Sequence, residues 1–93
     1  PIVRTHAVTG RKLLFVNDVY TIGIQDMNGP ESNALLGYLF QHSKQVSFLC
    51  RVRWEPGTVT MWDNRCVQHH AINDYPGQRR EMYRVTLAGE VPV

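Results

Sequence analysis

The sequence predicts a mostly β protein with one or two helices, and more specifically part of an antiparallel jelly roll. Several short runs alternate apolar and polar residues, and a single longer run has helical spacing. Turn residues separate the alternating runs at short intervals, as in antiparallel folds. The pattern allows about five strands. A complete jelly roll has about eight, so these 93 residues are expected to form only part of one.

The expected strands make two hairpins and one final strand. They run over Ile2–His6, Lys12–Val16, Val46–Trp54, Thr58–Asp63 and Arg79–Leu87. Gly10 supplies the positive-φ position of the first hairpin. In the second turn, Pro56 sets φ and Gly57 accepts a positive φ.

One helix is expected from about Glu31 to Ser43. Pro30 suits a first helical turn, and Glu31 lies beside the positive end of the helix dipole. One apolar stripe follows at helical spacing, formed by Leu35, Leu36, Leu39 and Phe40. His42 is interpreted as a histidine near the negative end of the dipole. Residues 17–28 are expected to be irregular.

Composition excludes several classes of protein. The chain is 43% hydrophobic and 19% charged, as in ordinary globular proteins. Its net charge of +2 is spread along the chain, so nucleic-acid binding is not predicted. The longest apolar stretch, about Ala34 to Phe40, is far shorter than the roughly 20 residues of a membrane span. Cys50 and Cys66 form neither a CxxC pair nor a disulfide framework, so a reduced, cytoplasmic protein is expected.

The N-terminal proline has two interpretations. Some tautomerases use such a proline amine as a base, which would make Pro1 catalytic. Here Pro1 leads directly into a predicted strand. We therefore favour a chain that begins partway through a domain.

Two arginines of the final strand predict an anion pocket. Arg80, Met82 and Arg84 share one face, because side chains alternate along a strand. The two guanidinium groups are roughly 13 Å apart along the strand. Such groups bind carboxylates and sulfonates through paired hydrogen bonds, so two small anions could bind. From spacing alone, the alternative is that both face solvent or pair with neighbours such as Glu81.

Histidines give a weaker signal. His69 and His70 are adjacent, so only one of them can face a given interior in an extended segment. Asp63, Asp74 or His42 could join His69 around a metal, but none has the spacing that fixes ligands on one element. A complete metal site within the chain is therefore not expected.

The order of these residues resembles the C-terminal end of the taurine dioxygenase family. The resemblance rests on Trp62-Asp63-Asn64-Arg65, His69-His70-Ala71, Asp74-Tyr75 and Arg79-Arg80 to Arg84. Earlier segments match in the same order: Arg4-Thr5-His6, Thr9-Gly10-Arg11-Lys12, Leu35-Leu36 and Arg53-Trp54-x-Pro56-Gly57. The resemblance therefore extends over essentially the whole chain.

The resemblance implies a dioxygenase that uses Fe(II), 2-oxoglutarate and O2. His69 matches the distal histidine of a metal site made by two histidines and one carboxylate, with His70 as the alternative. Arg80 matches the 2-oxoglutarate-binding arginine, Arg84 the arginine that binds the substrate's anionic group, and Trp62 a pocket-lining residue. Anchoring rather than catalysis is implied for Asp63, Asn64 and Arg65.

The implied reaction is hydroxylation of a small anionic substrate, coupled to decarboxylation of 2-oxoglutarate to succinate. The substrate would be taurine or another alkyl sulfonate, a sulfate ester or a carboxylate. In the sulfonate and sulfate cases, hydroxylation beside the heteroatom releases sulfite or sulfate and leaves an aldehyde.

The family's His-x-Asp pair would lie upstream of this chain. None of the four histidines is followed two positions later by Asp or Glu. Residues 1–93 are therefore predicted to be the C-terminal portion of a double-stranded β-helix domain. The metal site would be incomplete and the isolated chain inactive. An open half barrel should also self-associate or pair with the missing N-terminal part. The alternative function is a non-catalytic β module for anion binding or protein interaction.

Overall fold

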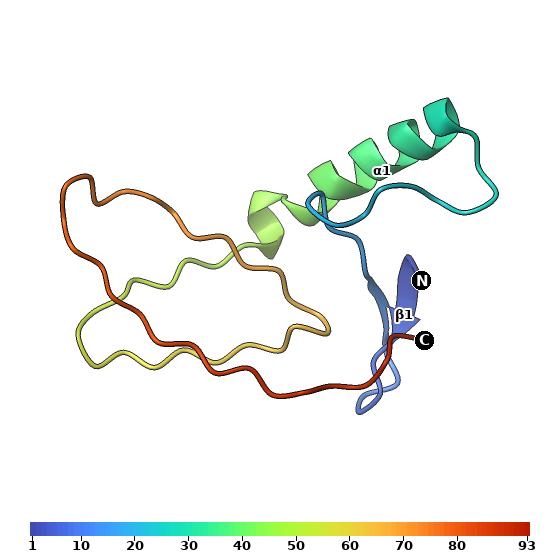
Figure 1. Cartoon of the computed structure of the whole chain (residues 1–93). Coiled ribbons are helices and arrows are strands. Elements are labelled where there is room, and N and C mark those ends of the chain that lie inside the picture. The colour runs from blue at the N-terminus through green and yellow to red at the C-terminus, as the bar shows by residue number, and fades with distance from the viewer.

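The computed structural model describes residues 1–93 and divides the chain into a folded N-terminal half and long extended ribbons (Figure 1). All regular elements lie in the first half: β1 (Val3–Thr5), β2 (Lys12–Leu14), α1 (Gly29–Ser43) and the 3-10 turn η1 (Val46–Phe48). The radius of gyration is 16.2 Å. A close-packed domain of this length would have about 12 Å, so the chain is loosely arranged.

The first predicted hairpin is confirmed. β1 pairs antiparallel with β2, with Arg4 opposite Leu13. Gly10 has the expected positive φ of 69°, and its N–H donates to the His6 carbonyl at 2.8 Å. On the other side of β1, the Thr5 N–H donates to the Val93 carbonyl at 3.1 Å. The end of the chain therefore lies beside the hairpin, as Figure 1 shows.

The predicted helix is also confirmed and begins slightly earlier, at Gly29. Asn28 caps it, because its Oδ1 accepts from the Glu31 N–H at 2.9 Å. The preceding residues are irregular, as expected. They are held to the helix by the bond from the Ile24 N–H to Ser32 Oγ, at 2.9 Å. With 15 residues, α1 is too short to span a membrane, and the chain has no longer helix.

The core is very small. Val16 and Leu36 are the two buried apolar side chains, and each is 3% exposed. The remaining buried residues are polar: Arg4, His6 and Ser32. Because so little apolar surface is removed from water, hydrogen bonds and ion pairs carry an unusual share of the contacts between distant segments.

Three predicted strands are absent, and those predictions were wrong. Val46–Phe48 forms the 3-10 turn, while the rest of Val46–Trp54, Thr58–Asp63 and Arg79–Leu87 has no ladder partner. The turn between the first two segments does form, since the Thr58 N–H donates to the Glu55 carbonyl at 2.9 Å.

The physical reason is the lack of lateral partners. A strand requires hydrogen bonds from a neighbouring backbone and a surface on which to bury its apolar face. Here Val59 is 89% exposed and Leu87 is 88% exposed. Cys50, expected on an apolar strand face, is exposed as well. The structure thus supplies one helix and a two-stranded antiparallel sheet in a mostly non-helical chain.

Candidate functional site

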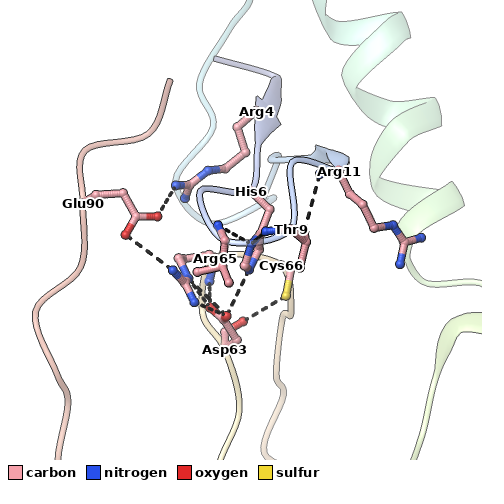
Figure 2. Close-up of polar contacts among 9 residues, drawn as sticks. Arg4, His6, Thr9, Arg11, Asp63, Arg65, Cys66 and Glu90 are labelled. Carbon is pink, nitrogen blue, oxygen red and sulfur yellow. Dashed lines mark hydrogen bonds and ion pairs between the residues drawn. The ribbon is translucent and has the colours of Figure 1, made fainter.

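A polar cluster joins three distant parts of the chain (Figure 2). We define it by Arg4 and His6 from the hairpin, Asp63 and Arg65 from the middle of the chain, and Glu90 near its end. Arg65 Nε donates to Asp63 Oδ1 at 2.9 Å and its Nη2 donates to Oδ2 at 2.7 Å. On its other side, Arg65 Nη1 lies 3.5 Å from Glu90 Oε2. The cluster therefore ties the chain end to the first hairpin.

Arg4 completes the cluster from inside the hairpin. Its Nη2 donates to Glu90 Oε1 at 3.2 Å. Its guanidinium carbon lies 4.9 Å from the centre of the Phe15 ring, so a cation–π contact adds to the ion pair. The side chain is only 3% exposed, and its Nε is buried without a partner. The guanidinium group of Arg4 is thus held by the Phe15 ring against its face and by the Glu90 carboxylate at its edge.

The hydrogen bonds of His6 define its tautomer. Nδ1 accepts from the backbone N–H groups of Val8 and Thr9, both at 3.2 Å. The proton of the neutral ring must then be on Nε2, which donates to Asp63 Oδ2 at 3.2 Å. Both ring nitrogens are therefore engaged within the chain.

Charge pairing shifts the acid groups of the cluster. The hydrogen bonds from Arg65, first from its side chain and then from its backbone, hold the pKa of Asp63 well below its usual range. The same pairing raises the pKa of Arg65. The pKa of Glu90 is lowered by a hydrogen bond with its own backbone N–H and then by the charges of Arg65 and Arg4. All of these groups are charged near neutral pH.

Two residues of the cluster, together with the neighbouring Cys66, form a set of possible metal donors that does not fit a metal. Donor atoms of His6, Asp63 and Cys66 all lie within 4.8 Å of one another. However, both His6 nitrogens and both Asp63 oxygens already have hydrogen-bond partners. The Arg65 cation is also 2.7 Å from the carboxylate and would repel a second cation. We therefore interpret this group as an anchor.

A tight turn follows Asp63 and leads to His69. The Asp63 carbonyl accepts from the Cys66 and Val67 N–H groups at 3.1 and 3.0 Å. The Asp63 side chain accepts from the Arg65 N–H at 2.9 Å, which is an Asx turn. This reversal brings His69 back to Trp62, with ring centroids 4.7 Å apart and planes tilted by 45°.

His69 itself is exposed and makes no hydrogen bond within the chain. Both of its ring nitrogens are thus available to an outside ligand. The neighbouring Gln68 donates from Nε2 to the carbonyl of buried Val16, which holds this part of the chain against the end of the hairpin. Trp62 is half-buried, and its indole N–H donates to Asn64 Oδ1 at 2.9 Å.

Arg80 is not part of the polar cluster and lines a separate hollow of about 340 Å³. The hollow is lined by Tyr75, Gln78, Arg80 and Met82. The Arg80 guanidinium carbon lies 5.2 Å from the centre of the Tyr75 ring, and its Nη1 donates to the Tyr75 hydroxyl at 3.2 Å. This neutral partner orients the cation and leaves its charge unbalanced.

Arg84 is exposed and has no hydrogen bond or ion pair within the chain. The nearby carboxylate of Glu81 is bound instead by Arg79 and by the Tyr83 hydroxyl, the latter at 2.7 Å. Neither of the two predicted anion-binding arginines is therefore neutralised by an acid of this chain.

The structure brings together some of the predicted residues and not others. Trp62 and His69 are in ring contact, whereas no hydrogen bond or ring contact joins His69 to Arg80 or Arg84. The three residues interpreted as anchors make local hydrogen bonds: Arg65 binds the Asp63 carboxylate, and Asn64 accepts from the Trp62 indole. The role of His6 was missed, because its partner lies 57 positions later and no spacing rule connects the two.

An exposed imidazole followed along the chain by uncompensated guanidinium groups is suited to binding a metal and small anions. The family comparison agrees with that class. The chain matches the taurine catabolism dioxygenase TauD, TfdA family over residues 1–86, and it belongs to this family.

Several curated relatives are similar over the entire chain. An alpha-ketoglutarate-dependent dioxygenase, cnsM, of Penicillium expansum is 46% identical over 100% of this chain and 26% of the relative. A putative alpha-ketoglutarate-dependent sulfonate dioxygenase of Schizosaccharomyces pombe is 44% identical over 99% of this chain and 24% of the relative. An alpha-ketoglutarate-dependent sulfate ester dioxygenase of Pseudomonas putida is 41% identical over 100% of this chain and 31% of the relative. The chain thus spans about a quarter to a third of their length.

Proposed function

We propose that the chain is the C-terminal portion of the double-stranded β-helix domain of an Fe(II)- and 2-oxoglutarate-dependent dioxygenase. Its membership of the TauD, TfdA family over residues 1–86 supports this, as do relatives named for dependence on alpha-ketoglutarate, another name for 2-oxoglutarate. The observation that carries the proposal is the oriented Arg80 cation, which has no acid partner in the chain.

His69 is the proposed metal ligand. Its exposed imidazole has no partner on either nitrogen, as a ligand requires, and the Trp62 ring limits its orientation. Fe(II) would supply the activation of O2. The three donors that lie close together in the chain, His6, Asp63 and Cys66, do not include His69. His69 would therefore contribute one ligand of a shared site. The isolated chain should then bind Fe(II) weakly and show no turnover, and tight stoichiometric binding would contradict this.

Arg80 and Arg84 are the proposed anion-binding residues. Arg80 would bind the far carboxylate of 2-oxoglutarate, beside the hollow that it lines with Tyr75. Arg84, which has no partner in the chain, would bind the anionic group of the primary substrate, and Trp62 would line the pocket. The names of the relatives include a sulfonate and a sulfate ester dioxygenase, so a small sulfonate, sulfate ester or carboxylate is the proposed substrate class.

The direct test uses the protein encoded by the whole reading frame that contains this chain. With Fe(II), O2 and a panel of alkyl sulfonates, sulfate esters and carboxylates, we expect substrate-dependent formation of succinate from 2-oxoglutarate. No succinate with any member of the panel would count against the proposal.

Arginine variants assign the roles. Arg80→Leu should raise the KM for 2-oxoglutarate by about 10- to 100-fold, because a charge-assisted pair of hydrogen bonds is lost. Arg84→Leu should instead raise the KM for the primary substrate. Arg79→Leu is the matched control: Arg79 is 86% exposed and pairs with Glu81, so both constants should stay near wild type.

A second candidate is a non-catalytic module that binds anions, because the Arg80 cation beside its hollow has no acid partner in the chain. Calorimetry of the 93-residue chain with 2-oxoglutarate separates the two. Millimolar or weaker binding fits a site completed elsewhere, whereas micromolar binding without iron supports the module.

The same samples test self-association, which we propose because the extended ribbons expose unpaired backbone. Sedimentation as a well-dispersed monomer would contradict it. Two free cysteines accord with the proposed cytoplasmic location.

A further inference from the structure

We propose that Asp63 is a positioning residue for His69, acting through the turn between Trp62 and His69. This inference rests on the proposed function, because it gives a role to the histidine that we assign to the metal. Asp63 would act only through contacts within this chain, without touching metal, 2-oxoglutarate or substrate.

Asp63 shapes the turn with both its side chain and its backbone. Its carboxylate accepts from the Arg65 N–H, and its carbonyl accepts from the N–H groups of Cys66 and Val67. These bonds reverse the chain immediately after Trp62. The reversal is what brings the His69 ring to 4.7 Å from the Trp62 ring.

The turn is fixed to the hairpin at two points. At its start, Asp63 Oδ2 accepts from Nε2 of His6, a residue that is only 7% exposed and whose tautomer is set by two backbone bonds. At its end, Gln68 donates to the carbonyl of Val16. The hairpin contains the only paired strands of the chain, so it is the most rigid base available to the turn.

Arg65 adds a third restraint through charge. It binds both oxygens of Asp63 and also reaches Glu90, so the carboxylate cannot rotate without losing an ion pair. A metal-ligating imidazole needs a narrow range of positions, and residues that hold it influence metal affinity without touching the metal. Two of the three restraints on the approach to His69 meet at Asp63, namely the bonds from His6 and from Arg65.

The first experiment follows the His69 ring protons by NMR in the metal-free 93-residue chain. In the wild type, the Trp62 ring current should displace these resonances from their free-histidine positions and give cross-peaks between the two rings. Asp63→Ala should abolish both effects. Asp63→Asn keeps an oxygen for the Arg65 N–H but loses the charge, so it should retain them in part. Asp74→Ala is the matched control, since Asp74 is also close to His69 in sequence but exposed and without hydrogen bonds.

The outcomes are separable. Unchanged His69 resonances in Asp63→Ala, with helix content intact by circular dichroism, overturn the proposal. If that variant loses its helix, Asp63→Asn decides alone. His69 resonances that move from their wild-type positions towards those of free histidine support the proposal, and resonances that stay at their wild-type positions overturn it.

A second measurement uses the protein from the whole reading frame. Asp63→Asn should weaken Fe(II) binding by about 10- to 100-fold while leaving the KM for 2-oxoglutarate near wild type. If Fe(II) binding and the KM for 2-oxoglutarate worsen by the same factor, the variant is generally unfolded and the positioning role is overturned. His69→Ala tests the proposed function separately: if it leaves Fe(II) binding intact, His69 is not the ligand, whatever the NMR result for Asp63.

Discussion

The two halves of the chain differ in how their backbones are satisfied. Residues 1–48 contain every helix and strand and both buried apolar side chains, Val16 and Leu36. Residues 49–93 run as extended ribbons joined by turns, with their apolar side chains largely exposed. Yet the proposed ligand and anion-binding residues, His69, Arg80 and Arg84, all lie in the second half. Elements whose partners are close in sequence therefore form on their own, whereas the residues proposed for the chemistry lie in segments that need distant partners.

Hydrogen exchange should show the largest contrast. Amides within α1 and the β1–β2 hairpin should exchange about 10- to 100-fold more slowly than those of residues 79–87, which have no ladder partner. Equal protection of the two regions at low protein concentration would contradict this contrast. Protection of residues 79–87 that increases with concentration would instead indicate strand pairing between copies.

Truncating a leucine should lower the free energy of unfolding more in the first half of the chain than in the second. Leu36→Ala should lower the free energy of unfolding by about 2 kcal/mol, because it empties one of two buried apolar positions. Leu87→Ala makes the same chemical change at a side chain that is 88% exposed, and its effect should stay within about 0.5 kcal/mol. Urea unfolding followed by circular dichroism measures both, and equal losses would refute the contrast.

Removing the helix cap should have a smaller effect, confined to the first half. Asn28→Ala should cost about 1 kcal/mol, since the Glu31 N–H loses its acceptor. Asn28→Ser keeps an acceptor and should recover most of the stability. Asn33→Ala, at an exposed position inside the helix, is the control and should not destabilise. Thermal unfolding of the four proteins tests this order.

The smallest effect should come from pH, at the polar cluster that joins the halves. The pKa values of Asp63 and Glu90 are lowered in the folded chain. Their contribution to the stability of the fold is therefore complete above the unfolded pKa values of 3.8 and 4.5. It is lost as the pH falls below these values. Both carboxylates are about a third exposed, so salt should screen the effect.

The measurement is the fluorescence of Trp62 in a Trp54→Phe background, followed between pH 6 and pH 2 at low and high salt. The transition should shrink in Asp63→Asn, and a transition centred near neutral pH would assign the change to another group.

Sequence reasoning succeeded where the physical signal is local. Gly10 could be recognised because a positive φ is needed at that turn, and the helix because its cap and first-turn proline are adjacent to it. It failed at Val85 and Leu87, where alternation describes a strand face but says nothing about the backbone that must pair with it. His69, Arg80 and Arg84 were assigned by resemblance, and their roles stay predictions.

Arg4 places an unusual constraint on the start of the chain. Its head group is enclosed by the Phe15 ring and the Glu90 carboxylate, with Nε sealed off from any acceptor. Lysine would preserve the charge but not the flat surface that rests on the ring, and its ammonium would have to give up water it holds more tightly. Exchanging these two cations, ordinarily a mild replacement, should therefore be poorly tolerated at position 4.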